Sequence, residues 1–439
     1  LPTRKSLWSG QYTLHDPEKG WGPLGNPDDA DLLTILNRRG VATTLISDCP
    51  YLNDPEMGFT QVWSRSERIR GSGYDNWSAS AGVKGVDCTQ EPGLKLPSPD
   101  EPACQTWKER WNQLLRNIKH TGRLDDESQS GVAKVVTKAV EILDQAGQGV
   151  NQFLWLDIFS PHGPWDLPEK YRDYYATEEA AQFEIQESGD LLGVEQVKPE
   201  AVRVLMDTPG GWIGEVISDE ELQRLRKTYA GAVTMLDTWV GRFLDYLEES
   251  GRLENSVLIF LSDQGEPLGE HGFVRRPIAN VYEELAHTPL IVRWPGIPDF
   301  GQRRSALVQS PDIAATVLDA FGETIPPYWH GRSLRPLLLD SESKIREFCL
   351  MGMDCEIFAI RTDEWLYIEP VENQEEQESG DLITEEERPK LFAKPEDRWD
   401  QNTLLFQHEE TVEILSGLLQ KKLDQLADGD IAFNEQSGT

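Results

Sequence analysis

The chain has 439 residues, of which 38% are hydrophobic, so it can bury a large core and is not disordered throughout. It carries 42 Lys and Arg residues against 76 Asp and Glu residues, which gives a formal net charge of -34. A field of this sign repels nucleic acid and anionic membranes, and no apolar run approaches the ~20 residues that span a bilayer, so we expect neither partner.

The first third of the chain predicts a helix followed by a strand. Residues 31–36 begin a short helix, and the β-branched run at 41–46 is typical of a buried strand. Residues 54–109 are rich in Gly, Ser, Asp and Trp with little periodicity, so we expect a long loop there. A second buried strand is predicted at 153–159, and it ends directly on the polar segment at 160–165.

The middle of the chain contains the clearest helix. Residues 178–200 are acidic and poor in large apolar side chains, which indicates a surface insertion. After this segment, Ser218 and Glu221 fit a capping box, and Gly251 supplies a helix stop. Between these ends the apolar residues recur at helical spacing, namely Leu222, Leu225, Tyr229, Val233, Leu236, Val240, Phe243, Leu244 and Leu247.

A short apolar run at 257–260 predicts a buried strand and is followed by Leu261-Ser262-Asp263-Gln264-Gly265. Asp263 and Gln264 should therefore emerge at the carboxyl end of a strand, the edge where ligands bind in open α/β sheets. One anionic and one neutral oxygen donor suit a hard divalent cation, although Asp-Gln-Gly can also serve simply as a turn. We predict that Asp263 and Gln264 bind a metal ion.

Strands that alternate with helices predict a mostly parallel sheet in the first part of the chain. Beyond about residue 346 the pattern changes to short strands at 357–360 and 365–368, followed by a last helix. The apolar face of that helix consists of Val412, Leu415, Leu419, Leu423 and Leu426. The sequence thus predicts two domains, an α/β domain over residues 1–345 and a smaller antiparallel domain over 346–439.

The five cysteines form an odd set without a CxxC pair or zinc-type spacing, which argues against a disulfide framework. They are Cys49, Cys88, Cys104, Cys349 and Cys355. Cys88 and Cys104 could pair across a loop in an exported protein, but reduced thiols in a cytoplasmic protein are the simpler expectation. Export stays open because the chain begins at Leu1 instead of methionine.

Several ordered motifs together resemble the sulfatase family of the alkaline-phosphatase superfamily. They are FLWLDIFSPHGPW at 153–165, SDQGEPLGEHG at 262–272, YEELAHTPLIVRWPG at 282–296, SPDIAATVLDAFG at 310–322 and HGRSLRPLL at 330–338. The resemblance implies an alkaline-phosphatase-like, mostly parallel α/β sheet flanked by helices, with a small antiparallel α+β subdomain at the carboxyl end. It also implies a hydrolase of sulfate esters that needs a divalent cation, usually Ca2+, with Mg2+ and Mn2+ as alternatives. Its substrate would be a small-molecule or glycan sulfate or phosphate ester.

The resemblance also indicates what the chain lacks. In the family the nucleophile is a cysteine-derived formylglycine, or a serine or threonine, in a CxPSR-type motif, and Pro2-Thr3-Arg4 matches the end of that motif. We therefore expect the nucleophile, and a first strand with two aspartate ligands, to precede Leu1, so that this fragment alone is inactive. The family motif GKWHLG corresponds to residues 48–52, where Cys49 and Tyr51 replace the lysine and histidine that contact the oxyanion.

By the same resemblance, three cationic residues have catalytic roles. Arg4 would orient the nucleophile and neutralise charge beside the metal, and its alternative is a surface arginine in a frayed terminus. His162 would bind the ester oxygen or protonate the leaving group, or else be structural. Arg276 falls where the family has an oxyanion-binding lysine, with Arg275 as the competing choice and a solvated arginine pair as the plain alternative. Such groups suit ester cleavage because negative charge grows on the oxygens around the reacting centre.

Two other functions stay open at this point. A phosphodiesterase or phosphonate monoester hydrolase of the same superfamily is favoured if the nucleophile is a serine or threonine. A non-catalytic relative that binds an anionic ligand is kept open by the replacements at Cys49 and Tyr51. His271 and His287 are expected to pack or support loops, and the sequence predicts neither the leaving alcohol nor the oligomeric state.

Overall fold

The computed structural model divides into two compact units that each consist of several chain segments. It describes residues 2–14, 22–24, 31–70, 126–147, 149–172, 174–176, 210–276, 278–297, 301–371 and 388–428. Unit 1 comprises Leu1–Arg39, Asn255–Gly265 and Ile278–Thr439, and unit 2 comprises Gly40–Glu254 and Glu266–Pro277. The domain boundary expected after residue 345 is not tested by this division and stays a prediction.

Some expectations fall on segments that lie outside the described residues. These are the insertion at 178–200, most of the loop at 54–109, and the pairing of Cys88 with Cys104. Of the other three cysteines, Cys49 and Cys349 are buried and Cys355 is half-buried. Within the described part of the chain, no helix is long and apolar enough to cross a bilayer.

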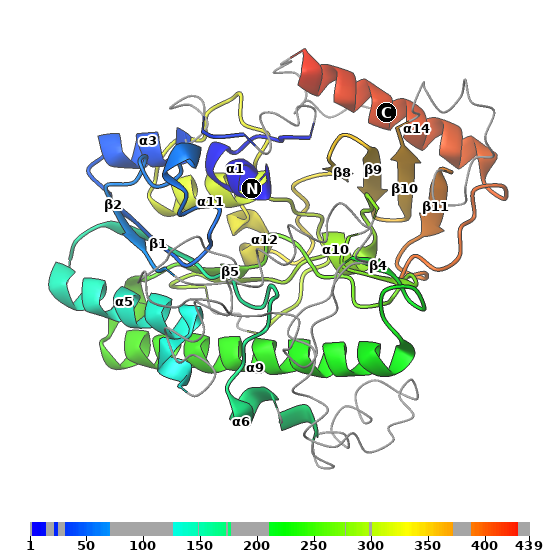
Figure 1. Cartoon of the computed structure of the whole chain (residues 1–439). Coiled ribbons are helices and arrows are strands. Elements are labelled where there is room, and N and C mark those ends of the chain that lie inside the picture. The colour runs from blue at the N-terminus through cyan, green and yellow to red at the C-terminus, as the bar shows by residue number, and fades with distance from the viewer. Residues whose placement is uncertain are drawn as a thin grey trace. The chain divides into compact units, whose positions relative to one another are not determined.

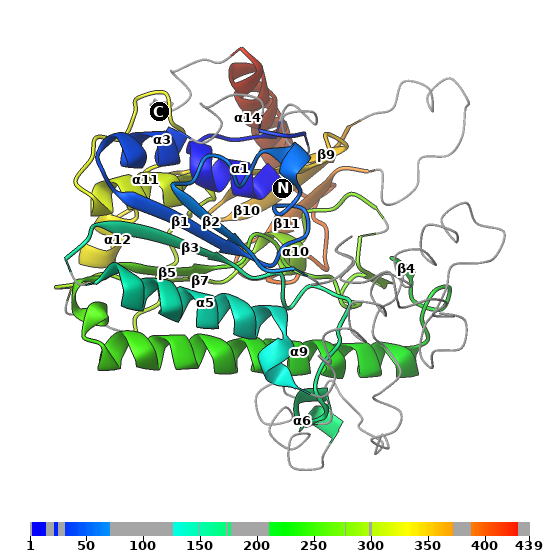
Figure 2. The same cartoon turned by 60° about the vertical axis from the view of Figure 1, so that its left-hand side comes forward.

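Unit 2 is built on a three-stranded parallel sheet with the order β2-β1-β3 (Figure 2). The strands are β1 (Ala42–Ser47), β2 (Arg65–Arg68) and β3 (Gln152–Asp157). β1 and β3 are the predicted buried strands, and their register pairs Ser47 with Asp157 at the carboxyl ends. β2 was not predicted, because its sequence Arg-Ser-Glu-Arg has no apolar alternation and lies in a stretch interpreted as loop.

Two helices of unit 2 pack against each other, and the shorter one also covers the sheet. α5 (Gly131–Ala146) packs on β1 and β3 through a cluster that contains Val135, Ala139, Ile142 and Ile46. α9 (Asp219–Glu249) begins with the predicted capping box of Ser218 and Glu221 and buries Leu222, Leu225 and Met235. Shorter elements of this unit are η2 (Pro55–Met57), η4 (Glu127–Gln129), α6 (Glu169–Arg172), η5 (Tyr174–Ala176), η6 (Arg252–Asn255, whose last residue belongs to unit 1), β4 (Gly211–Trp212) and β6 (Phe273–Val274).

Unit 1 contains the segment predicted to hold the metal. Its β5 (Leu258–Leu261) and β7 (Leu290–Arg293) are the strands expected at 257–260 and 290–294, and they pair with each other in antiparallel fashion. α1 (Pro2–Ser9) packs on α11 (Pro311–Ala320) and α3 (Asp31–Arg38). The remaining short helices of this part are α10 (Glu283–Ala286) and α12 (Arg335–Leu339).

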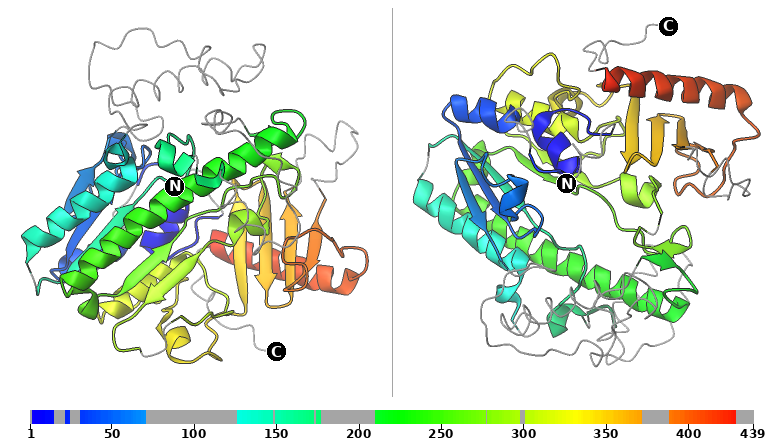
Figure 3. Two further views of the ribbon diagram at one scale, coloured as in Figure 1. Left: turned by 90° about the horizontal axis from the view of Figure 1, so that it is seen from below. Right: turned by 45° about the horizontal axis from the view of Figure 1, so that its top comes forward.

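The carboxyl-terminal part of unit 1 is an antiparallel sheet with the order β11-β10-β9-β8 and one long helix (Figures 1 and 3). The strands are β8 (Phe348–Met353), β9 (Ile357–Thr362), β10 (Trp365–Pro370) and β11 (Lys390–Ala393). α14 (Glu409–Ala427) packs on β9 and β10 with Leu415, Leu419 and Leu426 buried. The predicted strands and the apolar face of the predicted helix are thereby confirmed.

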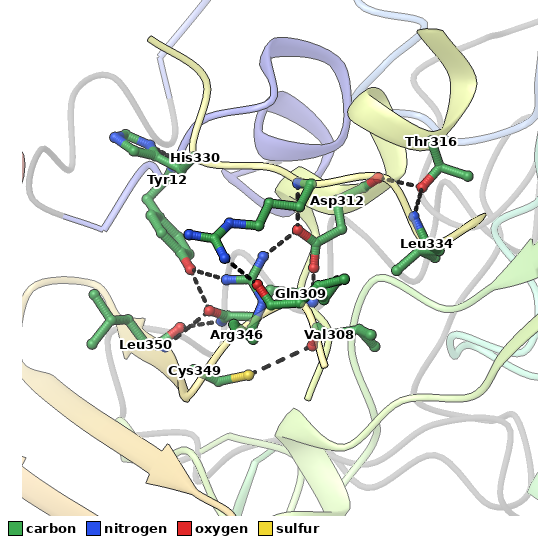
Figure 4. A network of polar contacts seen from close by, with 12 residues as sticks. Tyr12, Val308, Gln309, Asp312, Thr316, His330, Leu334, Arg346, Cys349 and Leu350 are labelled. Atoms are coloured by element: carbon green, nitrogen blue, oxygen red, sulfur yellow. Dashed lines mark hydrogen bonds and ion pairs between the residues drawn. The ribbon is translucent and has the colours of Figure 1, made fainter. Parts of the chain in front are cut away.

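A buried polar network joins β8 to the segments that follow α1 and precede α11 (Figure 4). The Asp312 carboxylate is fully buried, accepts hydrogen bonds from the backbone N–H groups of Gln309 (2.7 Å) and Arg332 (2.8 Å), and pairs with the Arg346 guanidinium. Arg346 also donates to the Tyr12 hydroxyl at 2.9 Å. Burial raises the pKa of the nearby Cys349 thiol to about 12, so this thiol stays protonated.

Replacing Arg346 with methionine tests how much this network stabilises unit 1. The substitution leaves the Asp312 carboxylate buried without its cation, which we expect to lower the free energy of unfolding by about 3–5 kcal/mol. Urea denaturation followed by circular dichroism measures the change. Lys344→Ala is the matched control, because Lys344 forms an exposed ion pair with Asp363 and its loss should leave the midpoint unchanged. Equal midpoints for both variants would contradict the prediction.

The turn after β5 needs a glycine at position 265 because another backbone passes against it. The Gly265 N–H donates to the Leu285 carbonyl of α10 at 2.8 Å. A Cβ atom at Gly265 would lie 1.8 Å from the Glu284 carbonyl oxygen, far inside van der Waals contact. The glycine of the Ser-Asp-Gln-Gly segment is therefore a packing requirement, and it fixes where Asp263 and Gln264 sit relative to α10.

Gly265→Ala should destabilise the protein although it adds a single methyl group. We expect a loss on the order of 3 kcal/mol, because backbone atoms must move to relieve the contact with Glu284. Gly417→Ala is the control, since Gly417 lies exposed in α14 with open space around it and alanine there should stabilise by about 0.5–1 kcal/mol. Melting temperatures that change in the same direction for both variants would argue against this account.

Candidate functional site

In unit 1, the structure brings together two of the predicted site residues that are 259 positions apart in the sequence. The Arg4 guanidinium, from α1, forms an ion pair with the Asp263 carboxylate just beyond β5. The side chain of Arg4 is 14% exposed and that of Asp263 is 26% exposed, so the pair is only partly open to solvent. This position excludes the alternative that Arg4 is a solvated arginine in a frayed terminus.

Hydrogen bonds hold the turn that carries Asp263 and Gln264. The Ser262 hydroxyl donates to the Gln264 carbonyl at 2.7 Å, and the Ser262 N–H donates to the Pro289 carbonyl at 3.3 Å. The turn therefore leaves the strand with a fixed backbone, which a metal site requires of its ligands.

The side chains of this turn carry donor atoms that suit a divalent cation. A carboxylate and an amide oxygen on adjacent residues are the donor types that Ca2+ and Mg2+ prefer. Among the described residues, however, no group of three or more His, Cys, Asp and Glu side chains is arranged to hold a metal ion. Asp263 and Gln264 thus offer two oxygen donors of the kind that a cation takes, and their binding of a metal ion stays a prediction.

Behind this turn, a buried ion pair supports α10. Lys394 and Asp400 pair at 2.5 Å with side chains 2% and 0% exposed, and the other Asp400 oxygen accepts from the Glu283 N–H at 2.8 Å. Burial raises the pKa of Asp400. His287, at the end of α10, is bonded to the Glu283 carboxylate, and this bond raises the pKa of His287. His287 therefore pairs with the first residue of α10, and its expected role in packing or supporting loops stays a prediction.

In unit 2, His162 lies in a loop that continues from the carboxyl end of β3. Its N–H donates to the Phe159 carbonyl at 3.0 Å, and its ring stacks on the Phe159 ring with centroids 4.5 Å apart. The Phe159 N–H in turn donates to the buried Asp48 carboxylate at 2.7 Å. Asp48 was not predicted as a site residue, and a buried acid directly after a strand is the signal that could have identified it.

The His162 ring has a defined tautomer in this arrangement. Its Nδ1 lies 2.5 Å from the Gly163 carbonyl oxygen, which can only accept, so Nδ1 carries a proton. Nε2 is then the acceptor nitrogen of the neutral ring, and His162 can donate a proton from Nε2 only as an imidazolium.

Arg275 and Arg276, the two candidates for the oxyanion-binding position, occupy different surroundings. Arg276 is half-buried beyond β6. Arg275 pairs with Glu266 at 3.4 Å and lies over the Trp165 ring, and a Cβ atom at Gly163 would be 2.3 Å from its Nη2. Arg275 therefore has contacts that reach the loop of His162. The role of Arg276 stays a prediction.

The two replaced family positions also lie in unit 2, directly after β1. Cys49 is buried with 1% exposure, and its N–H donates to the Ser47 hydroxyl at 3.1 Å. Tyr51 is 49% exposed and meets the Phe159 ring edge-on at 6.3 Å. Tyr51 is therefore the replacement that reaches the loop of His162, while Cys49 serves the core.

Models of known protein families match most of the chain. The sulfatase family model matches residues 1–323, and the model of the N-sulphoglucosamine sulphohydrolase carboxyl-terminal region matches residues 269–404. The two matches overlap over residues 269–323. This overlap follows the turn at residues 262–265, called here the metal-type turn, which carries Asp263 and Gln264. Together they cover residues 1–404, which include every predicted site residue and leave α14 outside the matches.

Two curated relatives are similar over part of their length. An arylsulfatase of Clostridium perfringens is 28% identical over 217 residues, which are 49% of this chain and 43% of that protein. An N-acetylglucosamine-6-O-sulfatase of Bacteroides thetaiotaomicron is 35% identical over 144 residues, which are 33% of this chain and 25% of that protein. The aligned residues thus span less than half of either relative.

Solved structures show the same fold along almost the whole chain. A protein in complex with its substrate, D-glucosamine-2-N,6-O-disulfate, has a TM-score of 0.62 and 17% identity, and covers 99% of this chain and 90% of its own. A phosphonate monoester hydrolase from Silicibacter pomeroyi has a TM-score of 0.62 and 21% identity, with coverages of 97% and 85%. These similarities confirm the predicted alkaline-phosphatase-like α/β fold. With a family model matched over residues 1–323, the chain belongs to the sulfatase family of the alkaline-phosphatase superfamily.

Proposed function

We propose that this protein hydrolyses sulfate esters with the help of a divalent cation. The observation that carries the proposal is the Arg4–Asp263 pair, because it joins the end of the nucleophile motif to the metal-type turn. A surface role would not explain why an arginine near the start of the chain is held, mostly buried, against a carboxylate at the end of β5. The family match over residues 1–323 supports the same assignment.

Asp263 and Gln264 would hold the cation through their carboxylate and amide oxygens. Members of this superfamily depend on divalent metals, and Ca2+ is the ion that we propose here, since all of the donors are oxygens. When bound, the cation would withdraw electron density from the ester oxygens and stabilise negative charge on them. Arg4 would balance the Asp263 carboxylate and help orient the group that attacks the ester.

His162 and Arg276 would act on the ester itself. The Nδ1 bond of His162 to the Gly163 carbonyl orients the ring, so its Nε2 would give a proton to the leaving alcohol once the ring is an imidazolium. Arg276 would bind a peripheral sulfate oxygen through its planar guanidinium. Cys49 is buried and would not contact the ester. Protonation of the leaving group would therefore depend more on His162 than in family members that have the usual lysine and histidine.

The substrate that we propose is a glycan sulfate ester. One relative is named an N-acetylglucosamine-6-O-sulfatase, and one similar structure holds a disulfated glucosamine as its substrate. A phosphonate monoester is the second candidate, because a phosphonate monoester hydrolase has the same TM-score as the sugar complex and a slightly higher identity. Parallel assays with N-acetylglucosamine 6-sulfate and a phenyl phosphonate ester would decide between these two substrates.

His162→Ala in the full-length protein should abolish most of the turnover of an aryl sulfate or of N-acetylglucosamine 6-sulfate. We expect kcat to fall by about 10²–10⁴-fold, the usual contribution of a general acid. His408→Ala is the matched control, because His408 precedes α14 without a side-chain capping bond, and its loss should leave kcat unchanged. An unchanged kcat in the His162 variant would remove this residue from the mechanism.

Asp263→Asn should weaken the binding of Ca2+ measured by titration calorimetry on the full-length protein. The substitution keeps the shape of the side chain but removes its negative charge, so we expect at least about a 10-fold rise in the dissociation constant. Asp363→Asn, on the exposed pair with Lys344, is the control and should bind Ca2+ like the wild type. Equal affinities for the wild type and the Asp263 variant would refute the metal assignment.

A further inference from the structure

Arg275 adopts a backbone conformation that arginine rarely accepts. Its φ is 63°, in the left-handed region, where residues other than Gly, Asn and Asp are uncommon. The Arg275 N–H donates to the Pro267 carbonyl at 3.0 Å, which holds the backbone in place. Strained residues of this kind persist where the surroundings fix them, and they concentrate at functional sites.

The side chain of Arg275 makes three contacts within unit 2. Its Nη1 lies 3.4 Å from the Glu266 carboxylate, and both side chains are largely buried, at 15% and 8% exposure. Its guanidinium lies 4.9 Å above the Trp165 ring centroid, at the distance of a cation–π contact. A Cβ atom at Gly163 would lie 2.3 Å from Nη2 of Arg275, so a side chain at position 163 would displace the guanidinium. Arg275 therefore touches the loop on both sides of Pro164.

These contacts continue to the imidazole of His162. The carbonyl of Gly163, the residue under the guanidinium, receives the bond from His162 Nδ1. The Trp165 indole N–H donates to the Pro161 carbonyl at 2.7 Å, so Trp165 ties the far end of the loop to its start. The guanidinium of Arg275 contacts Trp165 and the position of Gly163. It thus restricts the movement of the two residues that determine the orientation of His162.

We infer that Arg275 is a positioning residue for His162, acting through Gly163 and Trp165. The inference rests on the proposed function, in which His162 transfers a proton to the leaving group. Arg275 keeps the Gly163 carbonyl where it fixes the His162 tautomer, and Glu266 neutralises the buried cation that does so. The strained backbone at position 275 is what directs an arginine side chain toward this loop.

The test compares Arg275→Gly/Glu266→Gln with Glu266→Gln alone in the full-length protein, so that no buried carboxylate loses its cation. Glycine accepts a φ of 63°, so the melting temperatures of the two proteins should agree within about 5 °C. We expect kcat for an aryl sulfate to fall about 100-fold with KM changed less than about 3-fold, because a small displacement of a catalytic group has this effect. Amide hydrogen exchange of the peptide 159–165 should become faster.

Arg275→Lys separates charge from shape. Lysine keeps a cation beside Glu266 but cannot lie flat on Trp165 and reach Gly163 at once, so its kcat and exchange rates should fall between those of wild type and of the glycine variant. Wild-type kcat and exchange rates in the glycine or lysine variant would overturn the inference. A rise in KM with unchanged kcat would also overturn it, because Arg275 would then bind substrate directly.

His162→Ala, measured in the same assays, distinguishes a failure of the proposed function from a failure of the inference about Arg275. Full activity of the His162 variant would refute the proposed role of His162. An inactive His162 variant beside a fully active Arg275→Gly/Glu266→Gln protein would refute only the role of Arg275.

Discussion

The ion pair between Arg4 and Asp263 is the interaction on which the site in unit 1 depends. It connects a helix at the start of the chain with a turn beyond β5, and it brings together two residues that sequence distance alone would never relate. A carboxylate that is to bind a metal must be correctly aimed, and a neighbouring guanidinium favours one orientation of it. α1, which packs on α11, thus serves as a support for the metal-type turn.

Close contacts at glycines position the predicted site residues in both units. Gly265 lets α10 approach the turn that carries Asp263 and Gln264, and α10 is itself anchored by the buried pair of Lys394 and Asp400. In unit 2, Gly163 admits the guanidinium of Arg275 beside His162. At Gly265 the group that occupies the space of a Cβ atom is backbone, whereas at Gly163 it is the end of the Arg275 side chain. Rigid placement of this kind lets a site act without paying for reorganisation when charge develops.

The sequence predicted the elements with strong periodicity and the residues that follow them. The apolar runs identified β1, β3, β5 and β7, and the capping residues located the start of α9. β2 was not predicted because a short polar strand shows no alternation of apolar and polar residues. The antiparallel pairing of β5 with β7 was not predicted either, because periodicity does not encode which strands pair. The positioning role inferred for Arg275 was not predicted, since its left-handed backbone and its contact with Gly163 depend on the folded chain.

The strong negative charge of the protein opposes the approach of an anionic substrate, but this repulsion and the attraction at the site act over different distances. The net charge of -34 belongs to a surface whose field is screened beyond about 8 Å at physiological ionic strength. The Arg4 side chain is only 14% exposed, where water screens its charge far less. Long-range repulsion would slow the approach of a sulfated ligand, whereas the largely buried guanidinium of Arg4 and the cation that we propose would govern its affinity. Raising the ionic strength should therefore favour association until screening reaches the site itself.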